Sequence, residues 1–280
     1  MRISNFEFRN LVLLKLGGSL ITDKANPHTA RPALLARLAA EIAEVLAIHP
    51  QTPLLLGHGS GSFAHVSAQK HNTRQGVHNP DQWRGFATVW QDAASLNRLV
   101  MDALLAVGLP AITLAPSACV ISRERQILTW DLSPLQAALA AGLLPVIYGD
   151  AVFDTQLGGT VLSTEDLFAY LALSLHPKRI LLAGIEPGVW VNQPLSTREW
   201  DKEKGTIIPE ITSMNFSEIA PSLGGSTATD VTGGMADKVR QMLAVVEQLP
   251  DLEILIFSGE QPGLVRDVLL GANAGTRIHS

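Results

Sequence analysis

The sequence predicts an α/β protein whose core is a mostly parallel sheet with helices on both faces. Two observations lead to this prediction. Short apolar runs typical of buried strands alternate with segments whose apolar residues recur at helical spacing. Two glycine-rich segments also directly follow such runs, as loops at the carboxyl ends of parallel strands do. The 280 residues, 46% of them apolar, suffice for one large domain or for two lobes that share a sheet.

The first half of the chain supplies four expected strands separated by helical segments. These strands are expected at 11–16, 54–56, 111–114 and 143–148. Apolar residues at helical spacing predict a helix over 34–46, shortly after Pro32, and a long helix over 81–107. Residues 119–130 alternate loosely around three charged residues, which is typical of a surface hairpin.

The second half continues the alternation. Residues 163–166, reading STED, form a capping box in front of an apolar helix expected over 167–175. The other expected elements are strands at 180–183 and 254–257 and helices at 237–249 and 264–270. Residues 193–232 are the least regular and are expected to form loops. We expect a lobe boundary near Ser163, which divides the chain into 1–162 and 163–280.

The composition argues against several classes of binding partner and indicates a cellular location. The 21 basic and 26 acidic residues give a net charge of −5, which argues against nucleic-acid or membrane-surface partners. The single cysteine, Cys119, cannot form an intramolecular disulfide, and no cysteine–histidine spacing suits a metal. The first residues lack a signal-peptide pattern, and no apolar run approaches the ~18 residues of a membrane span. We therefore expect a cytoplasmic protein.

The most informative segment reads GHGSGSFAH and follows the apolar run 54–56. Around Gly59, Ser60 and Gly61 the backbone can approach a ligand closely and point N–H groups at anionic oxygens. His65 closes the segment and can donate to a phosphate oxygen. His58 allows two interpretations, a site residue or a histidine satisfied within the core.

A second glycine-rich loop follows the first expected strand. It reads KLGGS from Lys15 and continues to Thr22-Asp23-Lys24. It is not a Walker A loop, because Lys15 precedes the glycines, and no GxGxxG opens a helix. A lysine inside an apolar strand needs an anionic partner, since burying an uncompensated ammonium is costly. Two such loops predict a site for two phosphorylated molecules, as a phosphoryl-transfer enzyme requires.

Two further groups of residues accompany these loops. Gly233 and Gly234 open an expected helix, whose N-terminus favours phosphate, and Lys238 lies one turn further on. Gly149 and Asp150 follow the strand at 143–148. Asp150 could hold a lysine in position, help to organise magnesium, or simply stand in a turn.

Together these segments resemble the amino acid kinase superfamily, and most closely its isopentenyl phosphate kinases. The resemblance spans most of the chain and rests on KLGGSLITDK, GHGSGSFAH, PVIYGD, STEDL and TDVTGGMADK, in the family's order. It implies a three-layer α/β/α sandwich around one open, mainly parallel sheet, and a homodimer. It also implies an N-terminal lobe for the acceptor and a C-terminal lobe for ATP. The implied reaction is Mg²⁺- and ATP-dependent phosphorylation of isopentenyl phosphate to isopentenyl diphosphate.

The resemblance implies roles for individual residues. Lys15 would contact the transferring group, Lys24 and Lys238 the nucleotide phosphates, and His65 the acceptor phosphate, while Asp150 would position Lys15. Backbone N–H groups would come from Gly17, Gly18, Gly59 and Gly61. The implied nucleotide-binding residues are Lys15, Gly17, Gly18, Ser19, Lys24, Gly188, Asp230, Gly233, Gly234 and Lys238. The implied acceptor-binding residues are Gly59, Ser60, Gly61, His65 and Gly149. Magnesium would bridge ATP oxygens, with no protein ligand named.

The acceptor's hydrocarbon tail needs an apolar pocket, for which the helix at 81–107 is the expected wall. Phe86, Val89 and Trp90 are the candidates, and the alternative is that they are core residues of a long helix. The chain departs from the family pattern at Ser60 and Ala64, where glycines are usual. It departs again at 183–190, which lacks the usual aspartates.

Three other functions stay open. A fosfomycin-type phosphonate kinase shares a histidine in the acceptor loop. A kinase for a small carboxylic acid belongs to the same superfamily. A catalytically silent nucleotide-binding sensor belongs to a different class.

Overall fold

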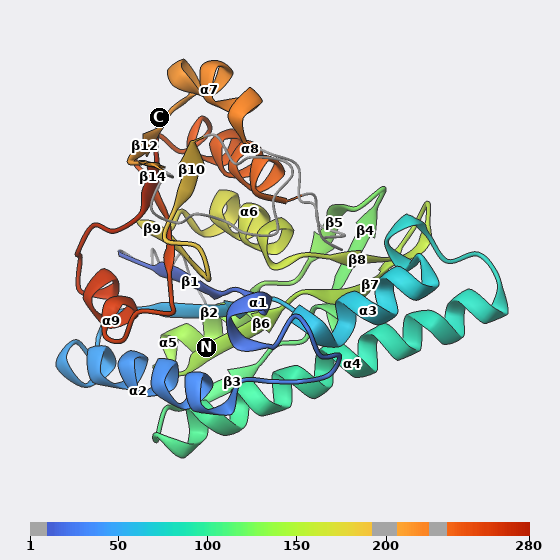
Figure 1. The fold of residues 1–280 in the computed structure, drawn as a ribbon. Coiled ribbons are helices and arrows are strands. Elements are labelled where there is room, and N and C mark those ends of the chain that lie inside the picture. Colours follow the sequence, from blue (N-terminus) through green and yellow to red (C-terminus); the bar gives the residue numbers. More distant parts are fainter. Residues whose placement is uncertain (1–9, 192–205, 224–233) are drawn as a thin grey trace.

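The computed structural model describes residues 10–191, 206–223 and 234–280, and its centre is an eight-stranded sheet (Figure 1). The strand order is β12 (Glu210–Ile211), β14 (Thr276–Ile278), β13 (Glu253–Ser258), β9 (Arg179–Gly184), β1 (Val12–Leu16), β2 (Leu54–His58), β6 (Leu144–Tyr148) and β3 (Ala111–Thr113). The six strands from β13 to β3 are parallel, and β14 runs antiparallel to β13. The sheet is therefore open and mainly parallel, as predicted.

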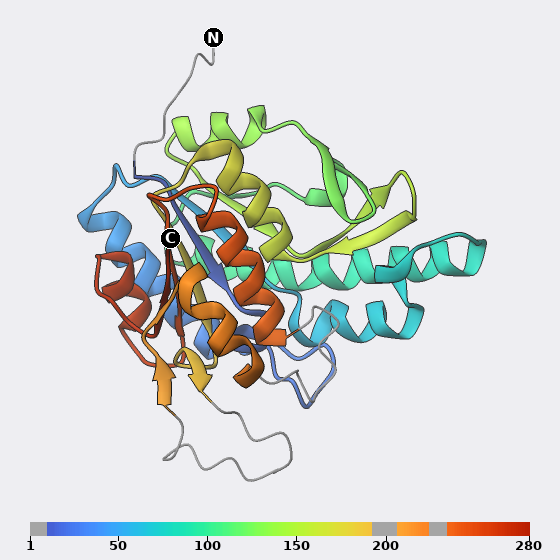
Figure 2. The ribbon, with the colours of Figure 1, turned by 90° about the horizontal axis from the view of Figure 1, so that it is seen from above.

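Helices cover both faces of this sheet (Figure 2). One face is packed by α2 (Pro32–Ile48), α4 (Pro80–Ala106) and α9 (Leu264–Leu269). The other face is packed by α5 (Ser133–Ala140), α6 (Thr164–Leu175) and α8 (Gly234–Val246). The prediction of a three-layer α/β/α sandwich is thus confirmed, and the helices expected from apolar spacing are all present within a few residues of their predicted ends.

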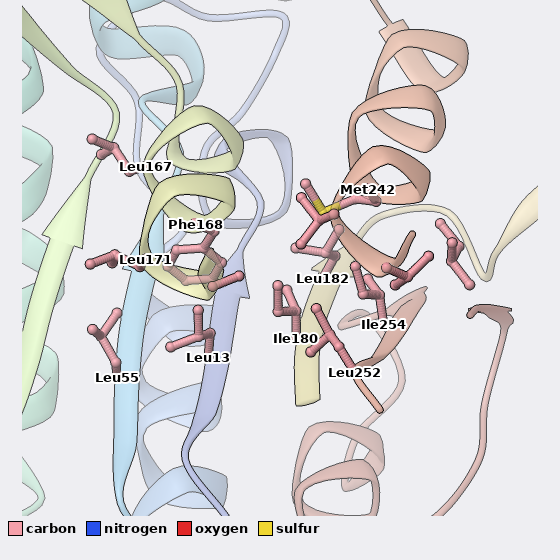
Figure 3. Packing of buried hydrophobic residues seen from close by; sticks show 14 of the residues in the cluster. Leu13, Leu55, Leu167, Phe168, Leu171, Ile180, Leu182, Met242, Leu252 and Ile254 are labelled. Carbon is pink, nitrogen blue, oxygen red and sulfur yellow. The ribbon is translucent and has the colours of Figure 1, made fainter. Parts of the chain in front are cut away.

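Each fully buried strand contributes side chains to the hydrophobic clusters on both faces of the sheet. All five residues of β1 are buried, and successive side chains point to opposite sides of the sheet. Leu13 packs with Phe168 and Leu171 under α6, where Figure 3 shows them, whereas Leu14 belongs to the cluster under α2 and α4. Each such leucine contributes about 1.5–3 kcal/mol on burial. The same alternation places Lys15 on the face of Leu13, beneath α6.

A smaller four-stranded sheet stands beside the main one. Its order is β5 (Gln126–Trp130), β4 (Val120–Arg123), β7 (Asp150–Asp154) and β8 (Gly158–Leu162). The β4–β5 hairpin confirms the hairpin expected at 119–130. The strands β7 and β8 were not expected. They follow Gly149 directly, so a segment that looked like a strand end begins a second sheet.

The remaining elements are short. They are α1 (Gly18–Ile21), α3 (Gly61–His71), η1 (Thr73–Gln75), η2 (Pro116–Ala118), β10 (Val189–Val191), β11 (Thr206–Ile208), α7 (Ser213–Ile219) and η3 (Ala220–Ser222). The expectation of loops over 193–232 is wrong for 206–223, which contain β11, β12, α7 and η3. The other residues of that region lie outside the described residues.

The predicted lobe boundary falls between β8 and α6, and the main sheet continues across it. The division into two lobes stays a prediction. Among the helices of the described ranges, none has the length and apolar character needed to cross a bilayer.

Candidate active site

The two glycine-rich loops lie side by side at the carboxyl edge of the sheet. They follow the paired ends of β1 and β2, where Leu16 lies opposite His58. A Cβ at Gly18 would lie 2.3 Å from the backbone nitrogen of Gly61, and a Cβ at Gly59 would lie 2.7 Å from the backbone nitrogen of Gly18. These glycines are required because the loops touch backbone to backbone.

The backbone N–H groups of the four glycines divide into two pairs. The N–H of Gly17 donates to Ala183 O at 2.8 Å, and that of Gly59 donates to Leu16 O at 3.0 Å. The prediction that these two groups serve phosphate is therefore wrong in this structure, because both shape the loops. Gly18 and Gly61 are the first residues of α1 and α3, where an N–H has no acceptor within its helix. Of the four, they are the N–H groups that no described residue accepts, which makes them the candidates for an anion.

The departures from the family's glycine pattern cause no strain. Ser60 has φ −82°, and Ala64 lies within α3 and has no positive φ. The positive φ of the loop, +50°, falls on Gly61. Ser60 Oγ donates to Gly149 O at 2.8 Å, so the serine joins the GHGSGS loop to the strand end after β6.

Lys15, Glu165 and Lys238 form a buried charge cluster next to the loops. Lys15 Nζ pairs with Glu165 Oε1, and Lys238 Nζ lies 3.4 Å from the same oxygen. Lys15 and Glu165 are both buried, whereas Lys238 is about one-third exposed. Among the described residues, two ammonium groups face this one carboxylate, an arrangement that suits an anionic ligand.

The elements that carry these three residues are fixed tightly against one another. Gly57 lies beside Lys15 on β2, and a Cβ there would lie 2.6 Å from Thr164 Cγ2. The missing side chain lets the N-terminus of α6 come down onto the sheet, where Thr164 Oγ1 donates to His58 O at 2.6 Å. The predicted capping box is present, and its Asp166 also accepts a hydrogen bond from Gln241 of α8 at 2.9 Å.

The charge state of Glu165 follows from these neighbours. Burial alone would raise the pKa of its carboxyl, but the charges of Lys15 and Lys238 outweigh burial and lower the pKa to about 2. Glu165 is therefore ionised throughout the neutral range. In the sequence, Glu165 is recognisable only as part of a capping box. The alternation of β1, which puts Lys15 under α6, was the signal that could have identified it.

Asp150 has a different setting. Its carboxylate is fully buried and accepts the N–H groups of Ser117 at 3.0 Å and Ala151 at 2.8 Å. Burial raises the pKa of Asp150 to about 6. The carboxylate that pairs with Lys15 is that of Glu165, so the predicted positioning role of Asp150 stays without support.

His65 and Lys24 lie on elements other than the three that carry the charge cluster. His65 is half-buried in the second turn of α3, whose first residue is Gly61. Lys24 is exposed on the segment between α1 and α2 and makes no ion pair with any described residue. Ser19 lies in α1 and Gly234 begins α8 with φ +73°.

Two predicted nucleotide-binding residues, Asp230 and Gly233, lie outside the described residues. Gly188 lies in the turn between β9 and β10. A Cβ there would lie 2.6 Å from Ile207 Cγ2, so packing alone requires a glycine. In the same segment, Trp190 Nε1 donates to Glu186 Oε2 at 3.0 Å. Glu186 thus supplies a carboxylate in the segment 183–190, which lacks the aspartates usual in the family.

The three residues predicted to line the apolar pocket differ in how deeply they are buried. Phe86 and Val89 are buried with Ala64 and Ala68 of α3, on the helix that also carries His65. Trp90 is 42% exposed and lies four residues after Phe86, on the same side of the helix. The pocket wall therefore stays a prediction for all three residues.

His58 is a core histidine, the second of its two interpretations. It is fully buried and stacks on Tyr148, with ring centroids 5.3 Å apart. Its ring nitrogens lie 3.1 Å from Gly59 O and 3.2 Å from Asn97 Oδ1. Burial lowers the pKa of His58, which favours the neutral ring.

The charge cluster and the two helix N-termini suit the phosphates of a nucleotide. In the described part of the chain, no three histidine, cysteine or acidic residues gather in a way that could hold a metal ion. Mg²⁺ at phosphate sites commonly keeps waters and phosphate oxygens as ligands, so groups that bind the phosphates of a nucleotide would also hold magnesium bound to it.

Comparison with known proteins agrees with this geometry. The sequence model of the amino acid kinase family matches residues 10–258. The isopentenyl phosphate kinase of Methanothermobacter thermautotrophicus is 34% identical over 279 residues, covering 96% of this chain and 98% of that protein. That of Haloferax volcanii is 35% identical over 260 residues, covering 91% and 98%.

Solved structures lead to the same family. A chain from the X-ray structures of isopentenyl phosphate kinase aligns with a TM-score of 0.79 at 30% identity, covering 96% of this chain and 99% of that one. The extent of these matches, together with the two glycine loops beside the Lys15–Glu165–Lys238 cluster, identifies the chain as a member of the amino acid kinase family.

Proposed function

We propose that this protein is an isopentenyl phosphate kinase. It transfers the γ-phosphoryl group of ATP to a phosphate oxygen of isopentenyl phosphate, which yields isopentenyl diphosphate and ADP. The observation that carries the proposal is the Lys15–Glu165–Lys238 cluster, whose Lys15–Glu165 pair is buried, beside two touching glycine loops. The similarity to isopentenyl phosphate kinases over nearly the whole chain supports this choice of acceptor within the family.

This reaction requires alignment of the two phosphates and neutralisation of their charge more than it requires a general base. The attacking phosphate oxygen is already anionic, so no group has to remove its proton. The main obstacle is repulsion between two phosphates, and the transition state spreads negative charge over the transferring group. Lys15 and Lys238 supply positive charge there, and Glu165 holds both ammonium groups in position. Magnesium, bound with ATP, neutralises further phosphate charge.

Acceptor recognition is assigned to the start of α3. The N–H of Gly61 and the imidazole of His65 both belong to its first two turns. A phosphate at this helix N-terminus would gain from the helix dipole and from a histidine donor. This arrangement selects an acceptor that carries phosphate. The buried Phe86 and Val89 lie on the neighbouring α4 and are proposed to face the hydrocarbon tail.

We also propose that the enzyme is a cytoplasmic homodimer. The cytoplasm supplies ATP, and a single cysteine suits a reducing compartment. Light scattering coupled to gel filtration would report a mass near twice 30.0 kDa for a dimer. A mass of one chain at working concentration would contradict the dimer and leave the catalytic proposal untouched.

The acceptor is tested by following ADP release from MgATP with three compounds offered separately. We expect turnover with isopentenyl phosphate and none with fosfomycin or N-acetylglutamate. Turnover with fosfomycin or N-acetylglutamate alone would keep the phosphoryl-transfer site and overturn the assigned acceptor. ATP binding without turnover of any acceptor would favour the nucleotide-binding sensor.

A further inference from the structure

The segment that carries Lys24 is clamped onto the start of α3. Thr22 and Ala30 form a bridge, and Asp23 N donates to Thr29 O at 2.9 Å, so residues 22–30 form a closed loop. In Figure 1 this dark blue loop runs from α1 towards α4 before it returns to α2. His28 N donates to Ser62 O at 3.1 Å, which joins the loop to the first turn of α3.

One side-chain contact joins the same loop to the long helix α4. His28 Nδ1 lies 3.6 Å from Asp92 Oδ1, and the imidazole also packs on the ring of Phe63, with centroids 5.4 Å apart. His28 has φ +52°, a left-handed conformation that is unfavourable for a residue with a side chain. The loop therefore accepts backbone strain at the residue that makes this contact.

Asp92 has little other use within the described residues. It is 9% exposed, and its Oδ2 is buried without a hydrogen-bond partner among the described residues. A buried carboxylate with one unpaired oxygen is destabilising unless something offsets it. The imidazole of His28 is the only ion-pair partner that the described residues offer to Asp92.

We propose that His28 and Asp92 form a latch that positions the Lys24 loop against α3 and α4. His28 is then a positioning residue that acts through Lys24, and Asp92 is its anchor. The catalytic part of this inference rests on the proposed kinase function, in which Lys24 meets phosphate. The structural part, that the pair holds the loop closed, does not depend on any activity.

Limited trypsin digestion tests the structural part, because trypsin cleaves after exposed lysines. The variants are His28→Ala, Asp92→Asn and the double variant, with Asp102→Asn, exposed on the same helix, as the matched control. We expect cleavage after Lys24 to become about fivefold faster in each single variant, because local opening precedes cleavage. The double variant should be no faster than the faster single variant. Cleavage after Lys70, exposed at the end of α3, is the internal reference.

Measurements of kcat test whether the latch acts through Lys24. With saturating MgATP and isopentenyl phosphate, we expect His28→Ala to lower kcat about fivefold in the parent chain and not at all in a Lys24→Ala background. His28→Asn, which tolerates the left-handed backbone and keeps a donor, should restore part of kcat.

The outcomes separate the two proposals. Unchanged cleavage after Lys24 in the single variants, or effects that multiply in the double variant, would overturn the latch. A faster cleavage with no turnover of any acceptor would keep the latch and reject the kinase. A loss of kcat that persists in the Lys24→Ala background would overturn positioning through Lys24.

Discussion

Lys15 and Glu165 form a buried ion pair that joins the central strand β1 to the first turn of α6. The pair lies at the carboxyl edge of the sheet, and Lys238 approaches the same carboxylate from α8. Burying a charge pair gains little stability by itself, because desolvation offsets the attraction. Its value here is orientation, since one carboxylate holds two ammonium groups from different elements at a fixed spacing.

The first prediction concerns Glu165→Gln. Glutamine keeps the shape but loses the charge that orients both lysines, so kcat should fall about 10²–10³-fold. The free energy of unfolding should fall by about 3–5 kcal/mol without nucleotide, because the buried ammonium of Lys15 loses the carboxylate with which it pairs. Saturating MgATP should recover part of this loss by supplying phosphate as the anionic partner.

Steady-state kinetics measure the change in kcat, and urea unfolding measures the change in stability. Glu247→Gln, an exposed residue, is the control, and a kcat like that of the control would refute the assignment.

The sequence is sufficient to predict the fold class because the signal is repeated. Each parallel strand is buried on both faces and therefore reads as an apolar run, and each crossover helix shows its own periodicity. The strands β7, β8, β12 and β14 carry no comparable signal. Both β12 and β14 are very short and exist as strands because neighbours pair with them. Such pairing is a tertiary property that a local pattern does not contain.

The active site also depends on tertiary contacts that a local sequence pattern does not contain. Lys15 and Lys238 were predictable because each follows or precedes glycines in a pattern suited to phosphate. Glu165 was not, because a capping box already explains an acidic residue at a helix start. For Gly17 and Gly59, the sequence shows a glycine but not which acceptor its N–H meets. Only the arrangement of neighbouring strands decides that question.

A second prediction concerns the contact between the two glycine loops. In Gly18→Ala the new Cβ would meet the backbone nitrogen of Gly61 at 2.3 Å, so the loops must separate. We expect about 2 kcal/mol or more of lost stability and a large loss of kcat. Gly108→Ala is the control, because it has φ +78° with nothing within 4 Å and suffers backbone strain of only about 1–2 kcal/mol. Equal stability and activity for the two variants would contradict the close contact.

The third prediction concerns Asp150 and pH. Burial raises its pKa from 3.8 to about 6, so the folded state binds a proton more tightly than the unfolded chain does. Its contribution to stability is therefore full below pH 3.8 and is lost as pH rises through 6, in total about 3 kcal/mol. Asp150→Asn cannot titrate and should lack this part of the pH dependence. Urea unfolding from pH 4 to pH 7 should show the variant gaining on the parent chain as pH rises. Parallel curves would show that the carboxyl does not titrate there.

The fourth prediction concerns His65→Ala. If the imidazole donates to the acceptor phosphate, its loss should raise KM for isopentenyl phosphate about tenfold or more and leave KM for MgATP nearly unchanged. Initial-rate kinetics with each substrate varied in turn would measure the two constants. Gln69→Ala, exposed on the same helix, is the control. Equal increases in both KM values would argue against acceptor recognition at this residue.

The fifth prediction distinguishes a pocket wall from a core residue on α4. The Phe86 ring packs against Trp83 and Phe153, with centroids 5.3 Å and 5.4 Å away, and lies in the cluster that includes Ala64 beside His65. If the hydrocarbon tail ends against this ring, Phe86→Ala should raise kcat/KM for geranyl phosphate relative to isopentenyl phosphate by about tenfold, because removed volume becomes available to a longer chain. Leu105→Ala, exposed near the end of the same helix, should leave this ratio unchanged. Phe→Ala in a core costs about 3–5 kcal/mol, so Phe86→Leu provides a milder variant whose ratio should shift in the same direction. A ratio that stays constant in both Phe86 variants while stability falls would mean that the ring serves packing alone, and the tail would then have to lie against another face of α3 or α4.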